Sequence, residues 1–110
     1  MGPLAISEAS FQSQVVELAR LYGWRLIHIK PTQIRPGRWI TATTGDSGFP
    51  DLVMARGKSL IFAELKRANG RLSDGQRVWI DALVRAGQEV YIWYPLDLPD
   101  IKNRLARIDK

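Results

Sequence analysis

The stretch from Leu60 to Leu65 is apolar at every position except Glu64. A strand that is apolar at successive positions is buried on both faces, like the central strand of a helix-covered sheet. A tight turn at residues 56–58 joins this strand, predicted over residues 59–66, to a second short strand over residues 52–55. The chain is therefore expected to fold around a central hairpin between layers of helix.

Helix and strand patterns alternate on both sides of this hairpin. Apolar residues at helical spacing predict helices over residues 7–22 and 73–86, each beginning at a serine N-cap and followed by a glycine. Residues 24–30 and 90–94 are predicted strands that end at prolines. The order helix, strand, strand, strand, helix, strand describes a small α/β domain with a mixed sheet.

Two segments fit this pattern less well. Residues 31–48 are polar and rich in glycine and proline, with a possible short strand over residues 38–44, and are expected to face the substrate. The tail from residue 97 onward could form a short final helix. The whole chain, residues 1–110, is expected to be a single domain.

Composition excludes several classes of protein. The chain lacks cysteine and has one histidine, so thiolate or multi-histidine metal sites are excluded. No apolar run is long enough to span a membrane. Sixteen Lys and Arg against eleven Asp and Glu give a net charge of +5, which favours a polyanionic partner such as nucleic acid.

Two carboxylates and a lysine are predicted to meet at one end of the hairpin. Strand pairing can bring Asp51 near Glu64, and Glu64 shares a face with Lys66 because the two are two residues apart. An unpaired carboxylate among apolar neighbours is costly unless a cation compensates, and grouped oxygen ligands hold Mg²⁺ or Mn²⁺. From these residues alone, an ion pair between Glu64 and Lys66 explains the pattern equally well.

The two predicted helices each add a polar residue. Glu8 falls in the apolar stripe of the first helix, so its carboxylate is expected to point inward over the sheet; its alternative role is to oppose the helix dipole. Gln76 lies on the helix face that carries Trp79, toward Glu64 and Lys66. It also has capping-box spacing from Ser73, and the two roles can coexist.

Candidate nucleic-acid contacts lie mainly in the polar segment. Trp39 with Arg35 and Arg38 combines an aromatic ring with positive charge, which suits unpaired bases, although Trp39 could equally close the loop against the core. His28 shares a strand face with Lys30 and is more typical of a structural histidine than of a phosphate contact. The candidate DNA-binding residues are His28, Lys30, Arg35, Arg38, Trp39, Arg67 and Arg71.

The motifs resemble a known nuclease family. Gly48-Phe49-Pro50-Asp51 followed by Glu64-Leu65-Lys66 resembles the PD-(D/E)xK signature of restriction-endonuclease-like nucleases. The pattern over residues 7–95, including Ser7-Glu8, Gly70-Arg71-Leu72-Ser73 and Gln76, is similar to the VRR-NUC branch and its short stand-alone phage members. The resemblance implies an αβββαβ core with a metal site of Glu8, Asp51 and Glu64, a catalytic Lys66, and an accompanying Gln76.

The implied activity is metal-dependent DNA cleavage in the cytoplasm of a bacterium or a phage-infected cell. Mg²⁺ or Mn²⁺ would be held by the three carboxylates and the backbone carbonyl of Leu65, and Lys66 would orient or deprotonate the attacking water. The alternatives are a non-catalytic basic nucleic-acid-binding module with the same fold, a flap-selective nuclease, and a subunit that needs a partner. Three carboxylates facing inward beside a polyanion disfavour the module.

Stand-alone members of the family are implied to act as homodimers on four-way (Holliday) junctions. One small domain offers one active site, so two symmetric nicks require two copies. The residues Ile92, Trp93 and Tyr94 suggest an exposed edge for such pairing, and packing under the C-terminal segment explains them almost as well.

Overall fold

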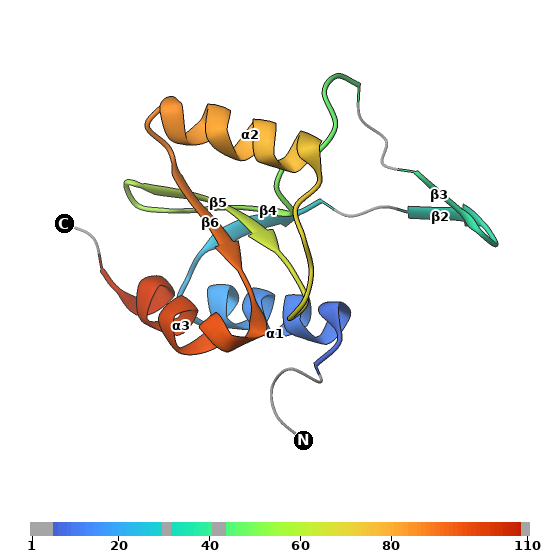
Figure 1. Cartoon of the computed structure of the whole chain (residues 1–110). Helices are drawn as coiled ribbons and strands as arrows, with labels where there is room; N and C mark the ends of the chain where they lie inside the picture. Colours follow the sequence, from blue (N-terminus) through green and yellow to red (C-terminus); the bar gives the residue numbers. More distant parts are fainter. Residues whose placement is uncertain (1–5, 30–31, 41–43, 109–110) are drawn as a thin grey trace.

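A four-stranded mixed sheet lies at the centre of the computed structural model, which describes residues 6–29, 32–40 and 44–108 (Figure 1). Its strand order is β1-β4-β5-β6, with β1, β4 and β5 antiparallel and β5 and β6 parallel. The strands are β1 (Arg25–His28), β4 (Leu52–Arg56), β5 (Ser59–Leu65) and β6 (Glu89–Trp93). The mixed sheet flanked by helices confirms the predicted α/β class and is compatible with a restriction-endonuclease-like core.

Helices cover both faces of this sheet. Figure 1 shows α1 (Glu8–Leu21) and α3 (Leu98–Ala106) on one face and α2 (Asp74–Arg85) on the other. The side chains of Ser7 and Ser73 cap α1 and α2 as predicted, and the possible final helix is present as α3, after a short 3-10 turn, η2 (Pro95–Asp97). Within the described ranges, no helix is long and apolar enough to cross a membrane.

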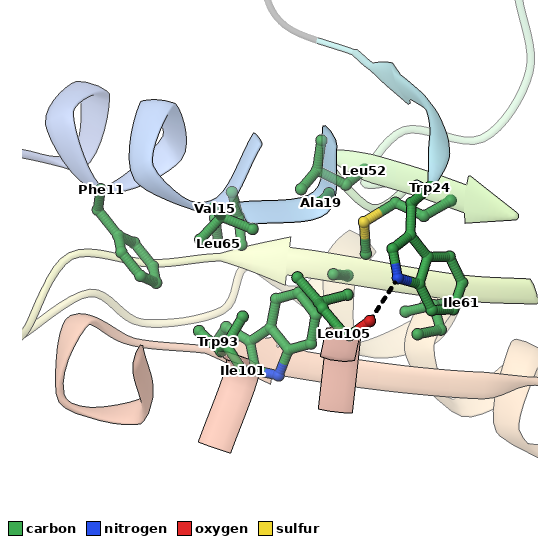
Figure 2. Close-up of a cluster of buried hydrophobic side chains, with 12 residues drawn as sticks. Phe11, Val15, Ala19, Trp24, Leu52, Ile61, Leu65, Trp93, Ile101 and Leu105 are labelled. Atoms are coloured by element: carbon green, nitrogen blue, oxygen red, sulfur yellow. Dashed lines mark hydrogen bonds between the residues drawn. The ribbon is translucent and has the colours of Figure 1, made fainter. Parts of the chain in front are cut away.

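The main hydrophobic core lies between the sheet and the α1–α3 layer (Figure 2). Phe11, Val15 and Ala19 recur every four positions along α1 and are buried in this core. The twelve core residues are Phe11, Val15, Ala19, Trp24, Leu52, Met54, Ile61, Ala63, Leu65, Trp93, Ile101 and Leu105. By contrast, α2 has no fully buried residue, and its apolar residues Trp79, Ile80 and Leu83 are half-buried.

β6 is an edge strand of the four-stranded sheet, as suggested from the sequence, but its largest side chain is buried. Trp93 is only 5% exposed and packs in the core against the α3 side, while Ile92 and Tyr94 are half-buried. Burial under the C-terminal helix explains Trp93, because α3 supplies Ile101 and Leu105 to the same cluster. The large Trp93 side chain of β6 therefore forms part of the hydrophobic core.

Arg56, the last residue of β4, ties α3 to the rest of the fold. Its guanidinium lies over the ring of Trp24 at 4.4 Å and donates hydrogen bonds to the backbone carbonyls of Tyr22, Leu105 and Arg107. Trp24 Nε1 also donates to the Leu105 carbonyl at 2.9 Å (Figure 2). These bonds satisfy carbonyls at the C-terminal ends of both α1 and α3, which have no partner within their own helices.

A second, two-stranded sheet is formed by β2 (Thr32–Arg35) and β3 (Arg38–Ile40). The sequence predicted only an optional strand over residues 38–44, and missed β2. The hairpin turns at Pro36 and Gly37, and Gly37 has φ of +79°, which a residue with a side chain rarely adopts. Short strands that pair only with each other give weak periodicity, so turn chemistry was the better signal here.

Candidate active site

Strand pairing places Asp51 beside Glu64. The register of β4 and β5 aligns Leu52 with Ala63, so Asp51 comes just before the strand at the level of Glu64. The two carboxyl groups lie close enough to share a hydrogen bond when one is protonated. Asp51 Oδ2 also accepts a hydrogen bond of 2.8 Å from the backbone N–H of Leu65. This pair of carboxylates, predicted from the hairpin, forms the centre of the site.

Two further side chains contact one oxygen of Glu64. Lys66 Nζ lies 3.7 Å from Glu64 Oε2, and Gln76 Nε2 donates to the same atom at 3.0 Å. Glu64 is only 2% exposed, and its second oxygen, Oε1, is buried without a hydrogen-bond partner. Lys66 is therefore placed to pair with Glu64 when Glu64 is ionised, but the second oxygen of this buried group has no partner.

This environment perturbs Glu64 strongly. Burial, followed by the negative charge of Asp51, raises the pKa of Glu64 from 4.5 to about 8, with Glu8 adding to the rise and Lys66 opposing it. The protein alone therefore favours the neutral carboxyl at this position. A residue so perturbed by burial and by a specific charged neighbour is typical of a functional site.

Gln76 performs both roles considered from the sequence. Its Oε1 accepts a hydrogen bond of 2.8 Å from the backbone N–H of Ser73, and its own N–H donates to Ser73 Oγ at 3.2 Å, which completes the capping box. Because the cap occupies the amide oxygen, the amide nitrogen is left to face Glu64. The start of α2 therefore sets the orientation of a side chain in the site.

The loop before Asp51 lies directly against the start of α2. A Cβ on Gly48, whose φ is +98°, would lie 2.3 Å from the carbonyl carbon of Gly75, and a Cβ on Gly75 would lie 2.9 Å from the Ser47 carbonyl oxygen. Only glycine at both positions allows the two backbones to come this close. The loop carrying Asp51 and the helix carrying Gln76 are thus packed as one unit.

Aromatic contacts hold the same loop in place. Trp79 Nε1 donates to the Asp46 carbonyl at 3.0 Å. The ring of Phe49 packs edge-on against Trp79 at 5.0 Å and Phe62 at 6.0 Å. Sequence reasoning assigned Trp79 only to packing and gave no role to Gly75; a glycine inside a helical first turn was the one signal for a close backbone approach.

Glu8 is exposed and is not buried over the sheet. It is the first residue of α1, it is exposed, and it lines a hollow of about 610 Å³ together with Ser7, Arg67 and Asn69. The helical phase did place Glu8 where its charge acts on Glu64. A residue in the first turn of a helix, however, has no preceding turn to cover it. Among residues 6–29, 32–40 and 44–108, no three acidic or histidine side chains lie close enough together to hold a metal ion.

The donor set of Asp51 and Glu64 nevertheless fits a divalent cation. Both groups supply hard oxygen atoms, which Mg²⁺ and Mn²⁺ prefer. A cation would relieve the repulsion that raises the Glu64 pKa, and would give the buried Oε1 a partner.

The candidate DNA-binding residues lie at several separate positions on the surface. Arg35, Arg38 and Trp39 are exposed on the β2–β3 hairpin; because Trp39 is 60% exposed, it does not close the loop against the core. Arg67 is exposed and lies beside Glu8. Arg71 is also exposed and lines a hollow of about 650 Å³ with Tyr94 and Asp97. His28 is half-buried and lines a hollow of about 390 Å³ beside α1. Lys30 lies outside the described residues.

A hollow of about 610 Å³ lies beside Asp51. It is lined by Asp51, Gln76 and Trp79 together with Ile29 and the loop of residues 44–49. The backbone N–H of Ile29 donates to the Asp51 carbonyl at 2.7 Å, so the end of β1 is joined to the same loop. Asp51 and Gln76, which both lie next to Glu64, are therefore in the wall of a space that is open to a substrate.

Comparison with known proteins identifies the family to which the chain belongs. A family model for the VRR-NUC domain matches residues 9–94. No curated protein and no solved structure gives a significant match. The matched region contains Asp51, Glu64, Lys66 and Gln76 together with the sheet that positions them. The chain therefore belongs to the VRR-NUC domain family of the PD-(D/E)xK nuclease superfamily.

Proposed function

We propose that the chain is a metal-dependent endonuclease that cleaves DNA of particular structures by hydrolysing phosphodiester bonds. The observation that carries this proposal is the pairing of the half-buried Asp51 with the buried Glu64, whose Oε2 contacts Lys66 and Gln76 and whose Oε1 has no hydrogen-bond partner. Asp51, Glu64 and the backbone carbonyl of Leu65 would hold Mg²⁺ or Mn²⁺, with Glu8 approaching from the rim. When bound, the ion would polarise the scissile phosphate and lower the pKa of water.

The chain's own side chains then have separate tasks. Lys66 is held near Glu64 but is still partly exposed, with 15% of its side chain accessible, so it can reach a substrate phosphate. There it would orient the attacking water, or accept its proton, and offset the charge that develops on the phosphate. Gln76 holds Glu64 in place through its amide nitrogen and is therefore a positioning residue.

The basic residues around the site would bind the DNA backbone. Arg67 follows directly after Lys66, and Arg71 lies four residues further along the same connection to α2. Both are exposed, and with the net charge of +5 they favour a polyanion on this side of the molecule. His28 and Lys30 are proposed as further phosphate contacts.

The preferred substrate is proposed to be a four-way junction cut by a homodimer. The support is the resemblance to short stand-alone members of the family, and the need for two active sites related by a two-fold axis to make two symmetric nicks. A monomer that prefers flaps, and a module that binds without cutting, are the outcomes that would replace this proposal.

A direct test incubates the purified chain with labelled linear, flapped and four-way DNA in Mg²⁺ or in EDTA. Cleavage in Mg²⁺ only, fastest on the four-way junction, is expected. Lys66→Ala should abolish cleavage but not binding, because binding depends mainly on contacts to phosphates. Lys58→Ala removes the same charge from the exposed β4–β5 turn and serves as the matched control. Equal cleavage in EDTA would overturn the metal mechanism.

A further inference from the structure

The β2–β3 hairpin is a basic arm that stands out from the body of the protein. Every residue from Gln33 to Ile40 is exposed, and Figure 1 shows the hairpin projecting beyond the sheet and helices. From Trp24 to Gly45 the sequence has four basic residues and no acidic residue. The backbone and side chains of the arm are therefore accessible to a partner.

Two arginines lie opposite each other near the tip of this arm. Arg35 and Arg38 are cross-strand partners on either side of the Pro36–Gly37 turn. Like charges directly opposite each other destabilise a strand pair, and no acidic residue of the hairpin compensates them. An anion bound between or beside them would remove that repulsion, so the tip is suited to phosphate.

An exposed indole accompanies these charges. Trp39 is 60% exposed, next to Arg38 in sequence and opposite Gln33, and Ile34 is 55% exposed. A paired duplex presents its phosphates outward, whereas an indole gains most from the open face of an unpaired base. The combination therefore favours a nucleic acid with at least one base out of its stack. A second copy is disfavoured because two basic arms repel each other.

The arm starts and ends beside the carboxylate site. The chain leaves the body after Ile29 and returns at Thr44, and both residues line the hollow that contains Asp51 and Gln76. The four residues of β2 extend over about 13 Å. A nucleotide held on the arm would thus belong to the same DNA molecule whose backbone reaches the active site.

We propose that the β2–β3 hairpin binds a base that has left its stack at a DNA branch point, such as a fork or the centre of a four-way junction, with Trp39 stacking on the base and Arg35 and Arg38 contacting the flanking phosphates. Such a base would be the structural feature of DNA that the nuclease recognises. The inference rests on the proposed function only in that the bound DNA would be cut at the active site. Binding by the arm requires no cleavage and can be measured by itself.

The test uses forked DNA with 2-aminopurine as the first unpaired base, titrated in EDTA with the full chain. Quenching of 2-aminopurine reports stacking, and a fully paired duplex of equal length measures background binding. Trp39→Ala should abolish the quenching and weaken fork binding about 10-fold relative to duplex binding. Trp39→Phe should retain most of the quenching. Val84→Ala, at a 54% exposed site on α2, is the matched apolar control.

A double variant tests the arginines. Arg35→Ala with Arg38→Ala should lower the slope of log K against log salt by about 2, because each arginine that no longer neutralises a phosphate reduces the slope by about 1. Arg20→Ala with Lys102→Ala removes the same charge from exposed positions on α1 and α3 and should change the slope less. Unchanged melting temperatures are expected, because the arm is exposed.

Fork binding and quenching that survive Trp39→Ala would overturn the inference. So would light scattering in which Trp39→Ala converts a dimer to a monomer while the quenching persists, since the arm would then bind a second copy. The proposed function fails separately, by the absence of metal-dependent cleavage. A chain that cuts nothing would still report whether the arm stacks on a base.

Discussion

Replacing Glu64 with glutamine should stabilise the metal-free protein, although it removes a metal ligand. Glutamine keeps the shape of a neutral carboxyl group and leaves an oxygen to accept from Gln76. Wild-type Glu64 has a pKa of about 8 in the folded protein, against 4.5 as the reference for the unfolded chain. Because the folded state holds this proton more tightly, stability is highest below pH 4.5 and falls as the pH rises toward 8.

The size of the effect follows from this shift in pKa. Integrating the difference in proton binding between 4.5 and about 8 gives a loss of about 3 kcal/mol at pH 7, and of less than about 1 kcal/mol at pH 5. Glu64→Gln removes this dependence. The difference in unfolding free energy between the variant and the wild type should therefore grow by about 2 kcal/mol from pH 5 to pH 7.

The assay is urea denaturation of both proteins in EDTA at the two pH values. Glu17→Gln, at an exposed position on α1, is the control and should show no such change. A divalent cation should stabilise the wild type more at pH 7 than at pH 5, and should stabilise Glu64→Gln far less. If the difference between variant and wild type were equal at both pH values, the reasoning about a strained, buried Glu64 would be refuted.

The remaining predictions concern the parts that surround Glu64. Gln76→Ala should lower the cleavage rate at least 10-fold, because it releases Glu64, and should lower the free energy of unfolding by about 1 kcal/mol. Ser73→Ala should lower the free energy of unfolding by a similar amount but leave the cleavage rate within about twofold of wild type, and single-turnover kinetics with denaturation curves distinguish the two variants. Gly75→Ala should lower the melting temperature, opposite to the usual gain of up to about 1 kcal/mol for such a change in a helix, because the new Cβ meets the Ser47 carbonyl; a higher melting temperature would mean that the loop moves freely. Ca²⁺ should support DNA binding with little turnover, since its looser geometry positions water poorly; cleavage at the rate seen in Mg²⁺ would contradict this.

The elements predictable from sequence are those that depend on local pattern. The serine caps, the 3.6-residue repeat of α1 and the two-residue spacing of Glu64 and Lys66 are properties of neighbouring residues, and each is confirmed in the structure. The contact between Asp51 and Glu64 was also accessible, because a tight turn fixes the register of the two strands.

The features missed from sequence depend on contacts between distant segments. Glu8 is exposed although it has the helical phase of the buried Phe11 and Val15, so helical phase alone did not predict its exposure. The packing of Gly48 against Gly75 joins residues 27 positions apart, and the bond from Trp79 to Asp46 spans 33. β2 was missed because its four residues pair only with an equally short strand, so no burial pattern marks them.

The attachment of α3 through Arg56 affects where this protein can be shortened or fused. The family match ends at residue 94, yet Arg56 and Trp24, both inside it, donate to carbonyls at residues 105 and 107. A fragment trimmed to the matched region would lose those acceptors and uncover the side of Trp93 that faces Ile101 and Leu105. An independently folding unit must therefore extend through residue 107, and a tag or fused partner belongs beyond that point.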